Sequence, residues 1–214
     1  MTALLESTTN TRRRSPSTAL TLGIGLFGGF ALGVIARVWM RFISDKPDFT
    51  WSGTLAIVIG FTVFGLVQSA VAIARRRDLR RWKLTIVRVI GGIFMLQLFL
   101  AAGSVMLPTV LGAGLASARN DWHRVTRGIW LLVALGPVIF VTSHDLVSPF
   151  GWSLRAAIGL LWMLAIYAPI IAATRFVFAQ QADGWRLPRW ARIAVPLIIA
   201  AVLVALILAS GGFK

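Results

Sequence analysis

Long apolar segments alternate with short charged segments along this chain. Four apolar stretches have about the 20 residues that one α-helix needs to cross the hydrocarbon core of a bilayer, and they cover residues 20–41, 51–74, 153–174 and 193–210. A fifth, 128–143, is shorter and ends at the polar residues Ser143, His144 and Asp145. This pattern predicts an all-α bundle that crosses a membrane several times.

The tract from Leu84 to Ala118 is too long for one crossing. As a single helix it would extend about 52 Å at 1.5 Å per residue, against a hydrocarbon core of about 30 Å. We expect a break around Gly103-Ser104, because Pro108 would then stand early in a second helix, where its missing N–H costs little. The tract thus predicts two short helices, 84–102 and 105–118, and seven helices in all; one crossing would give six.

The positions of the basic residues favour seven helices over six. Cytoplasmic loops of membrane proteins carry an excess of Lys and Arg. With the N-terminus in the cytoplasm, seven helices place seventeen of the 22 basic residues on that side, whereas six helices place twelve there. We therefore predict a polar cytoplasmic tail at 1–18, a membrane domain at 19–210 and a short C-terminal tail at 211–214.

Composition agrees with a membrane protein. The chain is 57% hydrophobic and 14% charged, and its mean hydropathy is +0.81, which exceeds what a soluble core of this size buries. The net charge of +15 lies in clusters between apolar segments, so it indicates orientation in a membrane, and we expect no nucleic-acid partner. Nineteen of the 22 basic residues are Arg, a bias typical of GC-rich bacterial genomes, so we expect a bacterial cytoplasmic membrane.

Gly25, Gly29 and Gly33 repeat at four-residue spacing in the first predicted helix. Small residues at this spacing share one face, so that a second helix can approach closely and gain van der Waals contact. We expect this face to pack inside the bundle, against a second copy of the chain or against another membrane protein; a groove lining a pore is the alternative.

The same region resembles the opening of the small four-helix fluoride channels. The resemblance rests on Gly28-Gly29 with Gly33 and Arg37, followed by Ser52-Gly53-Thr54-Leu55 with Gly60 and Gly65. It covers about a fifth of the chain. Ile57-Val58-Ile59 stands where that family has its pore asparagine, so we transfer no function from it.

Ionisable groups are scarce in the predicted helices. All seven acidic residues fall in predicted tails or loops, whereas proton- or cation-coupled transport usually uses a buried carboxylate. Gln68 and Gln97 are the polar residues in the membrane segments that we single out. A lone glutamine there more often links two helices than binds a substrate.

The sequence also argues against an enzyme. The candidates are Asp121 with His123, and the consecutive Ser143, His144 and Asp145. A catalytic triad needs side chains that converge in space, and we expect sequence neighbours to diverge. The two histidines are predicted on opposite sides of the membrane, and there is no Cys. We expect no catalytic site, no metal site and no cofactor.

The charged run between the second and third predicted helices has a possible partner. Basic residues beside a helix end attract anionic lipid headgroups at about 1 kcal/mol each, and here they are Arg75, Arg76, Arg77, Arg80, Arg81 and Lys83.

From these features of the sequence, we expect a non-enzymatic accessory or scaffold subunit that acts through helix packing. A small permease or channel for a neutral or anionic solute, using Gln68 and Gln97, is the alternative.

Overall fold

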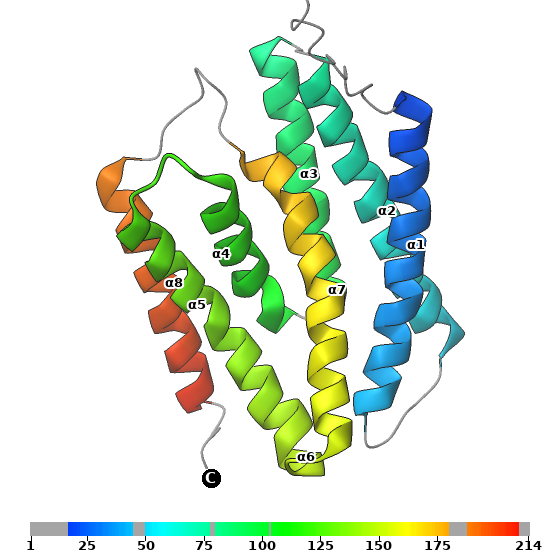
Figure 1. The fold of residues 1–214 in the computed structure, drawn as a ribbon, viewed down its shortest axis with the longest axis vertical. Coiled ribbons are helices and arrows are strands. Elements are labelled where there is room, and N and C mark those ends of the chain that lie inside the picture. The colour runs from blue at the N-terminus through cyan, green and yellow to red at the C-terminus, as the bar shows by residue number, and fades with distance from the viewer. Residues whose placement is uncertain (1–16, 45–49, 78–79, 103, 180–187, 210–214) are drawn as a thin grey trace, which may run out of the picture.

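Each long apolar stretch of the sequence forms a helix. The computed structural model describes residues 17–44, 50–77, 80–102, 104–179 and 188–209 (Figure 1). This part of the chain contains helices and turns and no strand, which confirms the all-α prediction. Its α-helices are α1 Thr18–Ile43, α2 Trp51–Arg76, α3 Arg81–Ala102, α4 Leu107–Ala118, α5 Arg124–Val141, α6 Ser148–Phe150, α7 Leu154–Phe178 and α8 Arg189–Ala209.

Four of these helical segments have the length and hydropathy of membrane-spanning helices. They are Thr18–Ile43, Trp51–Arg76, Arg124–Phe150 and Leu154–Phe178, with mean hydropathies between 1.8 and 2.2. Large apolar side chains are exposed along them, among them Phe27, Ile59 and Leu132. Water would not solvate this much apolar surface, so the protein belongs in a membrane.

Successive long helices run in alternating directions. In Figure 1, α1, α3, α5 and α8 run downward, and α2, α4 and α7 run upward. We call the end of the bundle where α1 begins and α2 ends the basic end, because Arg75, Arg76 and Arg77 lie there at the end of α2. Arg155, at the start of α7, lies at the opposite end.

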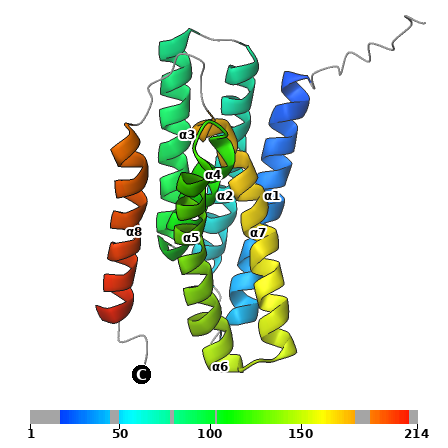
Figure 2. The same ribbon diagram turned by 60° about the vertical axis from the view of Figure 1, so that its left-hand side comes forward.

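The tract from Leu84 to Ala118 is divided where glycine and serine were expected to divide it. Helix α3 ends at Ala102, a 3₁₀ turn covers Ser104–Met106, and α4 follows with Pro108 in its first turn. However, Figures 1 and 2 show that α4 starts near the middle of the bundle, not at its far end. Its 12 residues extend only about 18 Å, so α4 is too short to cross a bilayer of about 30 Å.

This internal turn has a physical reason. Irregular backbone at membrane depth is tolerated where protein covers it, and here Met106 of the turn is buried, whereas Val105 is 40% exposed. The sequence alone predicts two short crossings with the turn at the membrane surface. The structure instead places the turn near the middle of the bundle, between its two ends.

The polar segment after α5 is also helical, where the sequence predicts a loop. Residues Thr142–Val147 form a π-helix that joins α5 to α6. Two hydroxyls donate to carbonyls of the preceding turn, Thr142 Oγ1 to Val138 at 2.7 Å and Ser143 Oγ to Phe140 at 3.0 Å. Such bonds satisfy carbonyls while the helix widens. The chain then reverses at Gly151, whose φ of 61° suits glycine.

The main core lies where α1, α2, α3 and α7 meet, with further residues from α4 and α5. It is apolar and rich in methionine and isoleucine, and its buried members are Ala36, Trp39, Phe61, Phe64, Met95, Leu98, Met106, Val110, Val141, Met163, Ile166 and Ile170. A smaller cluster of Ala116, Trp122 and Trp130 packs near the start of α5, with Ile199 of α8 against it.

Candidate functional site

The glycine face of α1 is occupied by α2. A Cβ added at Gly25 or Gly29 would overlap the backbone carbonyl oxygen of Gly65 or Phe61, and at Gly33 it would lie 2.9 Å from the Cα of Val58. The three glycines are buried, so this face serves packing inside the bundle and is not available to a second copy of the chain.

Gln68 is buried between α2 and α3. Its side chain is 3% exposed, and its Nε2 donates to the carbonyl of Gly91 at 3.5 Å. Its Oε1 has no hydrogen-bond partner among the described residues. Gln68 therefore links two helices through one weak bond and keeps a free acceptor. Gln97 lies on α3, but its side chain is outside the described residues.

The basic run divides into two groups. Arg75 donates to the carbonyls of Phe176 and Ala179 at 3.0 Å, where α7 ends. Arg76 and Arg77 donate to the hydroxyls of Thr21 and Thr18 on α1, at 3.2 and 3.1 Å. Three of the six residues thus hold the bundle together.

The second group faces away from the protein. Arg80 and Lys83 are exposed, and so is Trp82 between them, with Lys83 Nζ 5.6 Å from the Trp82 ring centroid. The side chain of Arg81 is outside the described residues. Arg80 and Lys83 therefore remain the members of the run that are best placed for lipid headgroups.

A groove lies at the opposite end of the bundle, between the end of α1 and the π-helical segment. It has a volume of about 530 Å³ and is lined by apolar and polar side chains: Met40, Ile43, Ser44, His144, Asp145, Ser148 and Pro149. π-Helical turns are frequent at functional sites, and this open groove includes the ionisable side chains of His144 and Asp145 in its lining.

His144 and Asp145 form a pair within this groove. His144 Nδ1 lies 2.9 Å from Asp145 Oδ1, and the Phe140 ring stacks on the imidazole at a centroid distance of 5.4 Å. The carboxylate orients the ring, so that Nε2 is the nitrogen left to act on a ligand. Our expectation that these sequence neighbours diverge is wrong for this pair, whose side chains meet within the π-helical segment.

The pair does not extend to a Ser-His-Asp triad. Ser143 Oγ donates to the carbonyl of Phe140, so that it is held on its own helix. His123, the other histidine, is the N-cap of α5 and accepts from the backbone N–H of Val125 at 3.3 Å. Among the described residues, no three His, Asp or Glu side chains cluster as metal ligands.

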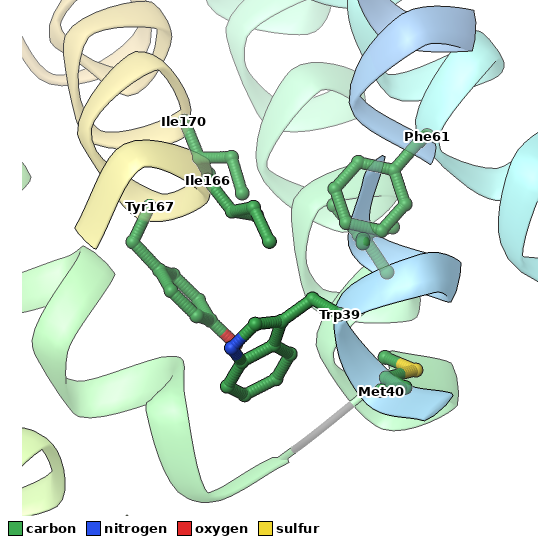
Figure 3. A pocket seen from close by; sticks show the side chains of 8 residues that line it. Trp39, Met40, Phe61, Ile166, Tyr167 and Ile170 are labelled. Atoms are coloured by element: carbon green, nitrogen blue, oxygen red, sulfur yellow. The ribbon is translucent and has the colours of Figure 1, made fainter. Parts of the chain in front are cut away.

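The interior below this groove is nearly filled. Figure 3 shows Trp39 and Phe61 facing Ile166, Tyr167 and Ile170 across a cavity of about 10 Å³. A cavity of this size barely admits one water. Trp39 closes it further, because its Nε1 donates to the carbonyl of Gly159 at 2.8 Å and fixes the ring. This cavity is too small to admit a solute larger than water.

Comparison of the chain with family models, curated proteins and solved structures finds no match. The partial resemblance of the first two helices to fluoride channels therefore has no support from a family model. The function must be inferred from the fold and the groove.

Arg155 is an important residue that sequence reasoning did not single out. Its guanidinium donates to the carbonyl of Phe42 through Nε at 3.2 Å and Nη2 at 2.6 Å, and lies 3.8 Å from the Phe150 ring centroid. It thereby joins the end of α1 to the α6–α7 turn beside the groove. An arginine at a helix start, where the dipole disfavours it, was a signal that could have pointed to such a contact.

Proposed function

We propose that this chain is a non-enzymatic accessory or scaffold subunit of a bacterial cytoplasmic membrane, which acts through helix packing and binds a partner membrane protein at its groove. The observation that carries the proposal is the nearly filled core between α1, α2 and α7, where the cavity measures about 10 Å³. A permease needs a polar path through the bundle. A packed bundle with a surface groove suits a binding subunit.

The groove suits a polar loop of the partner. Asp145 is 45% exposed and His144 is 63% exposed, so both can make hydrogen bonds without large desolvation cost. A Lys or Arg of the partner would form an ion pair with the Asp145 carboxylate, and its apolar side chains would contact Met40 and Ile43. Ser143 Oγ donates to the carbonyl of Phe140 and not to His144, which supports binding rather than hydrolysis.

Orientation follows from the charge at the two ends. The basic end carries Arg and Lys residues from six helix ends, whereas Arg37, Arg41 and Arg155 lie at the opposite end. The positive-inside rule then favours the basic end in the cytoplasm and the groove outside. Because the chain has no Cys, single cysteines can test this cleanly. Asn120→Cys should react from the cytoplasm and Trp152→Cys from outside, whereas the reverse pattern would contradict the proposal.

Photo-crosslinking tests the binding role. A photoreactive residue at Ser148, in the groove, should give one discrete adduct in intact membranes, identifiable by mass spectrometry. The adduct should weaken when Asp145→Asn removes the carboxylate. A photoreactive residue at Leu164, which is exposed on the lipid-facing side of α7, is the control and should give none. Equal adducts at both positions would contradict a specific groove.

Gln68 favours a second candidate, a permease for a neutral or anionic solute. Its Oε1 is buried without a described partner, and such an acceptor could bind a passing solute. Proteoliposomes that contain the chain should not swell in a gradient of neutral solute if the accessory role holds. Swelling that is abolished by Gln68→Leu would favour the permease instead.

A further inference from the structure

The histidine–aspartate pair in the groove can change its net charge and keep its contacts. His144 Nδ1 lies 2.9 Å from Asp145 Oδ1, and the Phe140 ring stacks on the imidazole with 14° between the ring planes. A neutral imidazole with its proton on Nδ1 donates to the carboxylate, and so does a protonated imidazole. A positively charged ring is also stable against an aromatic face. Protonation of His144 therefore leaves both contacts in place.

Two other properties of the pair do change when His144 is protonated. The pair carries one negative charge while the imidazole is neutral, and no net charge once it is protonated. In addition, Nε2 changes from a hydrogen-bond acceptor to a donor. A Lys or Arg side chain is positively charged and offers only donors, so both changes act against a basic ligand. The pair thus favours a basic segment only in its unprotonated form.

Within the described lining of the groove, His144 is the residue whose type ordinarily changes charge between about pH 5 and 8. The carboxylate of Asp145 is ordinarily ionised throughout that range. The other lining residues are not ionisable, and they are Met40, Ile43, Ser44, Ser148 and Pro149. The second histidine, His123, is the N-cap of α5, at the basic end and so away from the groove.

The charged groups on the neighbouring helices keep their charge in this range. Helix α7 contributes Arg155, which donates to the end of α1, and α1 contributes Arg37 and Arg41. Arginine stays protonated at these pH values. The last turn of α5 and the short α6 carry no ionisable side chain. Three further charged residues follow α1 and lie outside the described residues, namely Asp45, Lys46 and Asp48.

We propose that His144 makes the groove a pH-sensitive binding site, which holds a basic segment of the partner while the imidazole is neutral and releases it when the imidazole is protonated. This inference rests on the binding role proposed above. In the proposed orientation the groove faces the outside, so that acidification of the external medium would release the partner.

Photo-crosslinking at two external pH values tests this switch. With the photoreactive residue at Ser148 in intact cells, the adduct should be about fivefold weaker at a pH of about 5.5 than at about 7.5, because one exposed ion pair contributes at most about that factor. In His144→Gln, which keeps a neutral hydrogen-bonding side chain, the adduct should be equally strong at both pH values.

His123→Asn is the matched control for this experiment. It removes the other histidine, and Asn still caps a helix well, so the fivefold weakening at acid pH should persist. Asp145→Asn should give a weak adduct at both pH values, because the carboxylate that attracts the basic segment is gone.

Three results of the crosslinking would overturn the inference. If His144→Gln weakens at acid pH as much as the unaltered chain, the titrating group lies elsewhere. If the unaltered chain gives the same discrete adduct at both pH values, the binding role stands and the pH dependence fails. If Ser148 gives no discrete adduct at either pH value, the binding role fails and this inference fails with it.

A measurement on the purified full chain in a neutral detergent covers the case in which His144→Gln does not fold. The chain has two histidines, and His123→Asn identifies which imidazole signal in a nuclear magnetic resonance spectrum belongs to His144. That signal should shift between the same two pH values in parallel with the adduct yield. A His144 signal that does not shift while the adduct weakens would overturn the inference.

Discussion

The α1–α2 pair and α8 show two ways of attaching a helix in a membrane. Helices α1 and α2 approach backbone to backbone, because Gly25, Gly29 and Gly65 carry no side chain at the contact. Helix α8 lies at the edge of the bundle and packs mainly on α5 (Figure 2), where Ile199 meets a tryptophan cluster. In a membrane, apolar side chains are about as stable in contact with lipid tails as in contact with another helix. Helices therefore associate mainly through close packing of their backbones. We therefore expect α1–α2 to be fixed and α8 to be the more easily displaced.

The largest effect is expected at the α1–α2 contact. Gly29→Val would place side-chain atoms into the Phe61 carbonyl and near the Cα of Thr62, and backbone cannot move aside as a flexible side chain can. We expect a loss of about 3 kcal/mol or more in the free energy of unfolding, measured by denaturant titration in micelles. Gly28→Val is the control, because a Cβ at Gly28 meets nothing within 4 Å. Equal losses in both would show that α1 does not pack as described.

The next largest effect concerns the arginine that joins α2 to α7. Arg75→Gln removes two hydrogen bonds to the carbonyls of Phe176 and Ala179. Bonds from a charged donor contribute about 1.5–3 kcal/mol, and we expect a total loss of about 2 kcal/mol because Arg75 is partly solvated. Arg80→Gln, at an exposed position, should change stability by less than about 0.5 kcal/mol. An unchanged stability in Arg75→Gln would argue against its role in capping α7.

A smaller effect is expected where α1 meets α7. Trp39→Phe keeps an aromatic ring in the core but removes the donor to the Gly159 carbonyl, a buried bond of 2.8 Å. The carbonyl would be left without that partner, which costs about 1–2 kcal/mol. Trp152→Phe is the control, because Trp152 is 91% exposed and should have little effect on the midpoint of thermal unfolding. A midpoint shift in Trp152→Phe as large as in Trp39→Phe would contradict this assignment.

The smallest loss of stability is expected at the contact between α5 and α8. Trp130→Phe removes the hydrogen bond from Trp130 Nε1 to the carbonyl of Arg192, which is 3.0 Å long. We expect about 1 kcal/mol of lost stability, confined to α8 and visible as faster amide hydrogen exchange near Arg192. Trp190→Phe, at a site on α8 that is 72% exposed, should leave amide hydrogen exchange unchanged. Faster exchange in α1 as well would show that α8 is coupled to the whole bundle.

Several features of the candidate site could be predicted from the sequence. The spacing of Gly25, Gly29 and Gly33 predicts close packing, and the structure places α2 against that face. Gln68 was expected to link helices, and it does so through Gly91. The groove could not be predicted, because it depends on Met40 of α1 and His144 of the π-helix meeting in space, and these residues are far apart in the sequence.

The sequence by itself determined that this protein is an all-helical membrane protein and that the tract from Leu84 to Ala118 breaks near Gly103. The first follows because long apolar segments are more stable in the bilayer than in water. The second follows because glycine and proline are unfavourable inside a helix and so mark where it ends. Only the tertiary structure decided that the turn before α4 lies near the middle of the bundle, that Arg75 caps α7, and that His144 and Asp145 form a pair. These features depend on which helices become neighbours and on the local widening of one helix, and hydropathy along a single chain does not encode either.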